Sequence, residues 1–172
     1  NDFAFRRGSL ELWCALSGIE IALWDILGKA AGLPVYRLLG GACRERIRVY
    51  ANGWYKGASS AEDHVRAAER TVEAGFTALK FDPFPGPFRS HVPPADEDQA
   101  VALVEALRRA LGPEIEILVE GHRRLAPAHA KRVAARLEPL RPFWFEEPCP
   151  PENVEGLREV RVSTRIPIVT GE

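Results

Sequence analysis

The 172-residue sequence contains no methionine and only three cysteines, Cys14, Cys43 and Cys149. The cysteines are odd in number and widely separated, and no CxxC pair occurs, so neither a disulfide framework nor a structural zinc site is expected. Reduced thiols of this kind are typical of a cytoplasmic protein, which is the localisation we expect. Because the chain starts without an initiator methionine, we also expect it to be an internal segment of a longer protein.

The sequence also lacks an excess of positive charge. It has 23 Lys and Arg residues against 24 Asp and Glu residues, which gives a formal net charge of −1. A chain with this balance has no basic field to attract a nucleic acid or an anionic membrane, and we expect neither partner. It has no apolar run of about 18 residues and no charged-then-apolar leader, so we expect no membrane span and no export signal.

What the sequence does contain is an alternation of helical and strand-like segments. The first helix is predicted over residues 9–31, where Gly32 and Pro34 end it, and a short helical turn follows at 35–39. We then predict five strands, at residues 46–51, 76–82, 115–120, 143–146 and 166–170. We predict helices between them at residues 59–74, 96–111, 127–137 and 153–162, the first opened by Ser59 and Glu62 in a capping-box pattern.

Strands that alternate with helices of roughly ten to fifteen residues indicate parallel pairing through right-handed crossovers. An open doubly wound sheet and a (β/α)8 barrel both have this pattern. An open sheet is disfavoured because neither GxGxxG nor GxxxxGK[ST] occurs. A closed barrel needs eight strands and about 250 residues. We therefore predict an α/β fold that is a partial barrel, with about five of the eight strands.

Three of the predicted strands end in a glutamate, and Glu120, Glu146 and Glu172 are equally spaced in the sequence. In a barrel, neighbouring strands bring their last side chains to the same rim, where three carboxylates would repel one another. A hard divalent cation such as Mg²⁺ removes this conflict, because it takes oxygen ligands. Any one of these glutamates could be a solvated loop residue, but their repeated position favours a metal site.

Two further pairs of polar residues lie at strand ends. His122 follows Glu120 by two positions, and Lys80 and Asp82 have the same spacing at the end of the strand at 76–82. Because side chains alternate along a strand, each pair is expected on one side of the sheet. Considered alone, His122 could instead be a surface loop residue. The remaining histidines have no partner at metal-ligand spacing in the sequence, and we interpret them as surface residues: His64, His91 and His129.

Other candidates are less specific. Trp54 and Tyr55, in the loop after the first predicted strand, could line a pocket or simply pack in the core. Arg123 and Arg124 could contact an anionic substrate or could be solvated residues before a helix. Glu147 is expected to form a hydrogen bond or pair with a cation beside the metal rather than to bind the metal itself.

Five segments carry a recognisable combination of residues: 17–30, 50–54, 144–148, 151–153 and 170–172. Together they resemble the enolase superfamily, and within it the mandelate racemase/muconate lactonizing enzyme type, especially the acid-sugar dehydratases. The resemblance covers essentially the whole chain. It implies that residues 1–45 are the end of an N-terminal capping region with its linking helices. It also implies that residues 46–172 are the first five β/α units of a catalytic barrel.

The resemblance further implies roles for individual residues. Glu120, Glu146 and Glu172 match the three Mg²⁺ ligands at the ends of barrel strands three, four and five. His122 matches a general acid for the departing hydroxyl group, and Lys80 matches a lysine near the substrate carboxylate. The substrate-binding candidates are therefore Lys80, Asp82, Trp54 and Arg123.

Two positions depart from the family pattern. Glu120 stands where aspartate is usual, which adds one methylene group. Asp82 replaces the second lysine of a Lys-x-Lys pair, so that base is not available there. In relatives with such a replacement the base is a histidine on strand seven, which corresponds to a position beyond Glu172.

The activity implied by the resemblance is Mg²⁺-dependent dehydration of a sugar acid. A proton is removed next to the carboxylate, an ene-diolate forms, and the β-hydroxyl group departs. The charge that develops would be stabilised by Mg²⁺ and Lys80. The alternatives are a racemase or epimerase of a 2-hydroxy acid, or an inactive truncated barrel fragment. A small-molecule sugar acid is the expected partner, and a homo-oligomer is the expected assembly.

Overall fold

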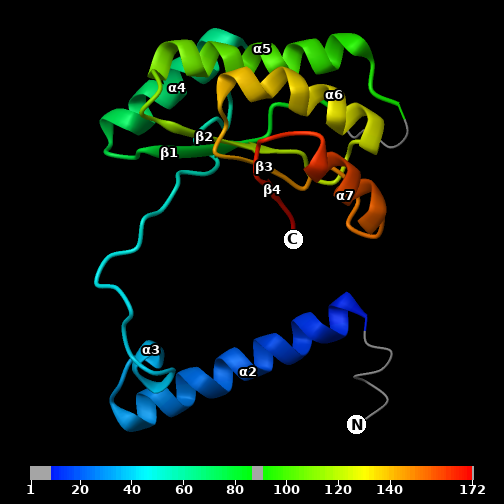
Figure 1. The fold of residues 1–172 in the computed structure, drawn as a ribbon. Helices are drawn as coiled ribbons and strands as arrows, with labels where there is room; N and C mark the ends of the chain where they lie inside the picture. The colour runs from blue at the N-terminus through cyan, green and yellow to red at the C-terminus, as the bar shows by residue number, and fades with distance from the viewer. Residues whose placement is uncertain (1–8, 87–90, 172) are drawn as a thin grey trace. The chain divides into compact units, whose positions relative to one another are not determined.

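The computed structural model describes residues 9–86 and 91–171. The chain divides into two compact units, Asn1–Arg48 and Val49–Glu172, each described here by itself (Figure 1). Among the described helices, none combines the length and the apolar composition that a membrane crossing requires.

The first unit consists of α2 (Leu10–Ala31) and the short α3 (Val35–Leu38). The side chain of Ser9 caps the start of α2 by accepting a hydrogen bond from the backbone N–H of Leu12 at 3.4 Å. Gly32 ends the helix with φ of 66°, a left-handed conformation that glycine adopts without steric cost. The predicted helix and its end are therefore confirmed.

The second unit is a parallel four-stranded sheet with the strand order β1-β2-β3-β4. Its strands are β1 (Ala78–Phe81), β2 (Glu116–Glu120), β3 (Trp144–Glu146) and β4 (Ile168–Val169). Its helices are α4 (Ala61–Glu73), α5 (Pro94–Leu111), α6 (Pro127–Leu137), the 3-10 turn η1 (Glu138–Leu140) and α7 (Val154–Val162). Figure 1 shows α4, α5 and α6 over one face of the sheet. The predicted strand–helix alternation with parallel pairing is confirmed.

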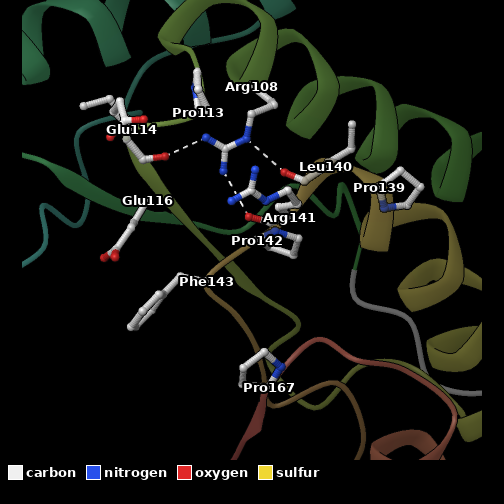
Figure 2. Close-up of a pocket in the computed structure, with 11 residues that line it drawn as sticks. Arg108, Pro113, Glu114, Glu116, Pro139, Leu140, Arg141, Pro142, Phe143 and Pro167 are labelled. Atoms are coloured by element: carbon white, nitrogen blue, oxygen red, sulfur yellow. Dashed lines mark hydrogen bonds between the residues drawn. The ribbon is translucent and has the colours of Figure 1, made fainter.

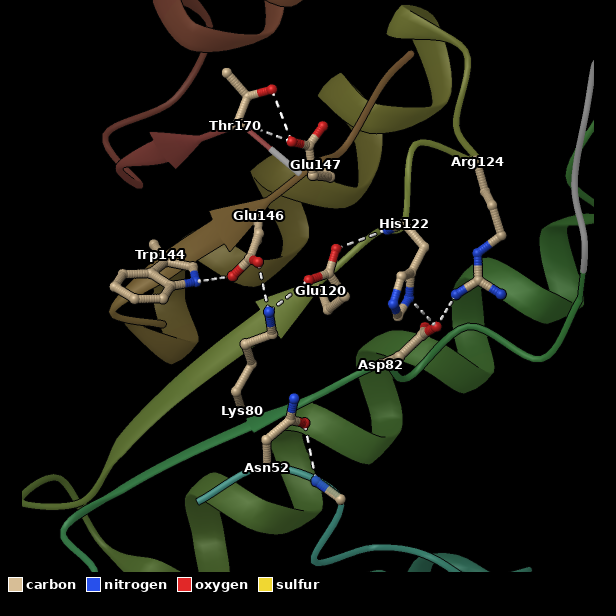
Figure 3. Close-up of polar contacts among 12 residues, drawn as sticks. Asn52, Lys80, Asp82, Glu120, His122, Arg124, Trp144, Glu146, Glu147 and Thr170 are labelled. Carbon is tan, nitrogen blue, oxygen red and sulfur yellow. Dashed lines mark hydrogen bonds and ion pairs between the residues drawn. The ribbon is translucent and has the colours of Figure 1, made fainter. Parts of the chain in front are cut away.

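The two faces of the sheet differ in chemistry because side chains alternate along each strand. The positions that face the helices are apolar and join the buried core, as Leu79, Phe81, Ile117, Val119 and Phe145 do. Four of the intervening positions carry polar or aromatic side chains on the opposite face, namely Lys80, Glu120, Trp144 and Glu146 (Figure 3), while Leu118 between them is apolar. The core thus positions a polar face at the ends of three strands.

The strand predicted at residues 46–51 is reduced in the described chain to one bridge, between Ala51 and Leu79. Ala51 donates to the carbonyl of Ala78 and accepts from the N–H of Lys80, both at 2.9 Å. Ile47 and Val49 are exposed, and without packing on both faces their alternating pattern does not hold them in the sheet. This edge position explains why the pattern overestimated the strand.

The capping box of α4 lies one residue later than predicted. Ser60, not Ser59, is the N-cap, and Asp63, not Glu62, completes the box. Hydrogen bonds from the Ser59 hydroxyl and backbone, and from Ser60, lower the pKa of Asp63 to about 2.

The interpretation of His129 as a surface residue is wrong, because its side chain is only 13% exposed. Its Nδ1 lies 2.6 Å from Oε1 of Glu97, a buried residue of α5, and Arg132 Nη2 donates to the same oxygen at 2.7 Å. Burial raises the pKa of Glu97, but the hydrogen bonds from Arg132 and His129 outweigh it and hold the pKa below its usual value. These contacts join α5 to α6. They cannot be predicted from the spacing of the residues in the sequence.

Candidate functional site

Lys80, Glu120 and Glu146 meet at the polar face of the sheet. The register pairs Glu120 with Glu146 at the ends of β2 and β3, and it pairs Lys80 of β1 with Leu118. Lys80 Nζ lies 2.8 Å from Glu120 Oε2 and 2.5 Å from Glu146 Oε1. Figure 3 shows the ammonium group between the two carboxylates, an arrangement that the strand-end pattern did not predict.

These three side chains form a coupled charge cluster with little solvent access, since their exposed fractions are 12%, 2% and 17%. Burial opposes the charge on Lys80, but the ion pairs with Glu120 and Glu146 outweigh it and raise the pKa of the amine. Burial and repulsion by Glu120 raise the pKa of Glu146. Burial also acts to raise the pKa of Glu120, but the ion pair with Lys80 and the hydrogen bond from the His122 backbone lower it. One ammonium group therefore does not fully compensate the two carboxylates.

The donor set fits a hard divalent cation. Within the described residues, Glu120 Oε2 is buried and accepts no hydrogen bond of normal geometry, although the Lys80 ammonium lies close to it. Buried carboxylate oxygens with unused lone pairs and uncompensated charge suit Mg²⁺ better than a soft metal. Residues 9–86 and 91–171 contain no group of three His, Cys, Asp or Glu side chains placed to hold a metal ion. Glu172, the third predicted ligand, lies outside the described residues.

His122 lies directly beside this cluster. Its backbone N–H donates to Glu120 Oε1 at 2.8 Å, and its ring Nδ1 lies 2.7 Å from Oδ2 of Asp82. The ring is 44% exposed, so it is accessible to a ligand at the strand ends. The sequence placed His122 next to Glu120, but its partnership with Asp82 was not predicted.

The loop after β2 is joined to the loop after β3 by backbone hydrogen bonds. Gly121 donates to the carbonyl of Glu146 at 2.8 Å, and Arg123 donates to that of Glu147 at 2.7 Å. A Cβ atom on Gly121 would lie 2.8 Å from the Glu147 carbonyl oxygen and 3.0 Å from Pro148 Cα. Only glycine allows this approach, so Gly121 positions both Glu120 and His122. Gly121 is not among the predicted site residues, although its position between Glu120 and His122 in the sequence was a signal for it.

Replacing Gly121 with alanine is expected to destabilise the full-length protein by about 1–3 kcal/mol. The added methyl group would clash with backbone atoms, which cannot rotate out of the way as a flexible side chain can. Urea unfolding would measure the free energy of unfolding. A stability equal to that of the wild-type protein would show that the two loops do not need this close contact.

Glu147 is fully buried and joins β3 to the segment after β4. Its Oε1 accepts hydrogen bonds from the Thr170 hydroxyl at 2.9 Å and from the Gly171 N–H at 2.5 Å. These bonds fix the backbone immediately before Glu172, which is the position predicted to supply the third ligand. Of the two interactions expected for Glu147, a hydrogen bond or a pair with a cation, the structure shows hydrogen bonds.

Trp54 and Arg123 were predicted to contact substrate, and those roles stay predictions. Trp54 Nε1 donates to the carbonyl of Lys80 at 2.9 Å, and its ring packs against Phe81 with the centroids 5.6 Å apart. The side chain of Arg123 is exposed, and its backbone is left-handed with φ of 60°. Trp54 therefore supports the end of β1, whereas Arg123 lies on the accessible side of the site.

Trp144 supports the second carboxylate. Its Nε1 donates to Glu146 Oε2 at 2.9 Å, and its ring meets Tyr50 edge-on with the centroids 5.9 Å apart. One oxygen of Glu146 is thereby bound to the indole while the other faces Lys80. Such a bond fixes the orientation of the Glu146 carboxylate.

Replacing Trp144 with phenylalanine is expected to weaken Mg²⁺ binding by the full-length protein about tenfold, because a partner of a metal ligand typically has an effect of this order. Phenylalanine keeps an aromatic ring but lacks the N–H donor. Calorimetric titration with Mg²⁺ would measure the affinity, with Trp24→Phe in α2 as the matched control. An unchanged affinity in Trp144→Phe would show that the indole does not orient Glu146.

A separate pocket of about 740 Å³ lies at the opposite ends of the strands (Figure 2). Arg108 fills part of it and donates to the backbone carbonyls of Gly112, Ile115, Leu140 and Arg141. Pro167 and Phe143, which precede β4 and β3, also line it. In barrels of this type the amino-terminal ends of the strands serve stability, so this pocket is not the candidate site.

Comparisons with known proteins agree with the geometry. Residues 63–172 match the family model described as enolase C-terminal domain-like, and residues 3–40 match the N-terminal domain of mandelate racemase / muconate lactonizing enzyme. The chain is 42% identical over its whole length to a D-gluconate dehydratase of Thermoproteus tenax. It is 40% identical, again over its whole length, to a D-gluconate/D-galactonate dehydratase of Picrophilus torridus.

A solved structure gives the same result for the fold. The crystal structure of mandelate racemase/muconate lactonizing enzyme from Jannaschia sp. CCS1 superposes with a TM-score of 0.89 at 41% sequence identity. The match covers 96% of this chain and 46% of that one. The chain likewise spans only 34% and 44% of the two curated dehydratases. The second unit therefore corresponds to part of the fold of these longer relatives.

Proposed function

Because this chain belongs to the mandelate racemase/muconate lactonizing enzyme family of the enolase superfamily, we propose that the full-length protein is an Mg²⁺-dependent lyase that dehydrates a sugar acid. The observation that carries the proposal is the gathering of Glu120, Glu146 and Lys80 at the carboxyl ends of parallel strands, with His122 beside them. The similarity to enzymes named for gluconate and galactonate supports the substrate class.

The polar face explains how the first step would be assisted. Removing the proton next to a carboxylate places a second negative charge on the carboxylate oxygens. Glu120, Glu146 and Glu172 would hold Mg²⁺, which supplies positive charge to stabilise those oxygens. Lys80 would contribute its ammonium group to the same oxygens. The base that takes the proton corresponds in the family to a position beyond Glu172.

Departure of the β-hydroxyl group requires a proton donor, and His122 is placed to provide it. Its ring is partly exposed, while its backbone is tied to Glu120. A donor fixed next to the carboxylates that orient the substrate can protonate the leaving oxygen as the carbon–oxygen bond breaks. The resulting enol then gives a 2-oxo-3-deoxy acid.

The proposal includes a division into a capping region, residues 1–45, and the first part of the barrel, residues 46–172. Two observations support it. The chain separates into compact units between Arg48 and Val49. The two family models match on either side of that point, at residues 3–40 and 63–172.

Incubating the full-length protein with D-gluconate, D-galactonate and D-mannonate tests the proposal. With Mg²⁺, at least one acid should yield a 2-oxo-3-deoxy acid, detected by its reaction with semicarbazide. Chelation of the metal should lower the rate about 100-fold or more. A folded, Mg²⁺-binding protein that produces only the epimer would indicate the racemase reaction. The absence of any product from a panel of sugar acids would refute the lyase proposal.

A further inference from the structure

Asp82 follows β1, and both of its carboxylate oxygens are engaged. Oδ1 accepts a hydrogen bond from the backbone N–H of Phe84 at 2.9 Å. Oδ2 lies 2.7 Å from Nδ1 of His122 and also contacts Nη2 of Arg124. The side chain is only 14% exposed. Three donors from two loops therefore hold the carboxylate in one orientation, and Figure 3 shows the contacts with His122 and Arg124.

Arg124 connects the same two loops. Its Nε donates to the carbonyl of Gly121 at 3.2 Å, and its Nη1 donates to that of Gly86 at 2.6 Å. Its Nη2 pairs with Asp82, and its side chain is 19% exposed. A guanidinium group bound on three sides is a rigid support, since its donors are coplanar. Its positive charge also compensates the negative charge of Asp82, while the His122 ring keeps its own contact with the same carboxylate.

The contact with Asp82 determines which ring nitrogen of His122 faces the substrate. An ionised carboxylate only accepts hydrogen bonds, so Nδ1 must carry a proton and donate it to Asp82. The other nitrogen, Nε2, is then the one that exchanges a proton with a ligand. The backbone N–H of His122 is bound to Glu120 at the same time, so both ends of the residue are fixed.

On the basis of the proposed lyase function, we propose that Asp82, supported by Arg124, is a positioning residue that holds His122 with Nε2 directed at the leaving hydroxyl. This assignment accounts for aspartate at the position where the family pattern has a second lysine. A lysine has no acceptor for the Nδ1 proton, so it cannot set this tautomer. Aspartate at position 82 therefore cannot act as the lysine base would, but it can hold the His122 ring through Nδ1.

The kinetic test uses Asp82→Asn in the full-length protein with Mg²⁺. The expected result is a fall in kcat for dehydration of about 100-fold, the usual weight of a general acid, with KM changed less than about threefold. Exchange of the substrate α-proton with deuterated water is retained, because that step does not use His122. Arg124→Met should show a smaller fall of the same kind, and Arg124→Lys should restore part of it. Asp98→Asn, which alters an exposed aspartate paired with Arg136, is the matched control.

A spectroscopic test needs no substrate, so it separates this proposal from the lyase proposal. Nitrogen NMR of histidine-labelled protein, at a pH where the rings are neutral, distinguishes the two tautomers, and His122→Gln assigns the signal. In the wild-type protein His122 should carry its proton on Nδ1, and Asp82→Asn should lose that preference. A wild-type proton on Nε2, or an Asp82→Asn protein with wild-type kcat, would overturn the proposal. If the wild-type protein dehydrates no sugar acid, the lyase proposal fails. The tautomer measured by NMR then decides by itself whether Asp82 positions the ring of His122.

Discussion

Replacing Glu146 with glutamine is expected to lower Mg²⁺-dependent turnover of the full-length protein by about a thousandfold or more. Glutamine has nearly the same shape, but it removes the charge of Glu146, one of the two carboxylates that face Lys80 and the more exposed of them at 17%. The remaining site has less negative charge to hold a divalent cation, and the cation is what stabilises the charge that develops in the reaction. Steady-state kinetics over a range of Mg²⁺ concentrations would measure the loss.

Glu105→Gln provides the matched control for this experiment. Glu105 is an exposed residue of α5 that pairs with Arg109 one helical turn away, so the same chemical change there should leave turnover unaffected. Loss of one group that stabilises the transition state typically lowers kcat by about 100-fold or more. A Glu146→Gln protein whose turnover stays within about tenfold of the wild type would therefore contradict the role assigned to Glu146.

Replacing His122 with asparagine should separate the two halves of the reaction. Dehydration is expected to fall about 100-fold or more, because the leaving hydroxyl group loses its proton donor. Exchange of the α-proton with deuterated water should continue, since proton removal depends on the polar face and on a different base. Proton NMR of the substrate follows both processes in one sample, and the retained exchange serves as the internal control. Undiminished dehydration in His122→Asn would show that another group protonates the hydroxyl.

The sequence predicted the strand ends well because their signal is local. An apolar run that ends in a carboxylate marks where a buried strand meets the rim, and this placed Glu120 and Glu146 side by side. The two-residue period of a strand was the basis for expecting Lys80 and Asp82 on one side of the sheet. Helix α6 also begins and ends where predicted, because Pro127 suits a first helical position and an apolar stripe continues to Leu137.

The contacts that the sequence did not reveal join segments far apart in the chain. Asp82 and His122 belong to different loops, and their pairing depends on how β1 and β2 align. His129 and Glu97 face each other only because α5 and α6 pack side by side. Gly121 matters because two loops approach closely, and a single glycine in a sequence does not identify its neighbour. These features depend on three-dimensional packing rather than on periodicity.

A crystal structure of the full-length protein with Mn²⁺ in place of Mg²⁺ would test the proposed metal site directly, because the anomalous signal locates the metal. We expect one metal ion about 2.1 Å from carboxylate oxygens of Glu120, Glu146 and Glu172, with Lys80 no longer bridging the first two. A metal bound away from these carboxylates, or a Lys80 that still bridges Glu120 and Glu146 at saturating Mn²⁺, would contradict it.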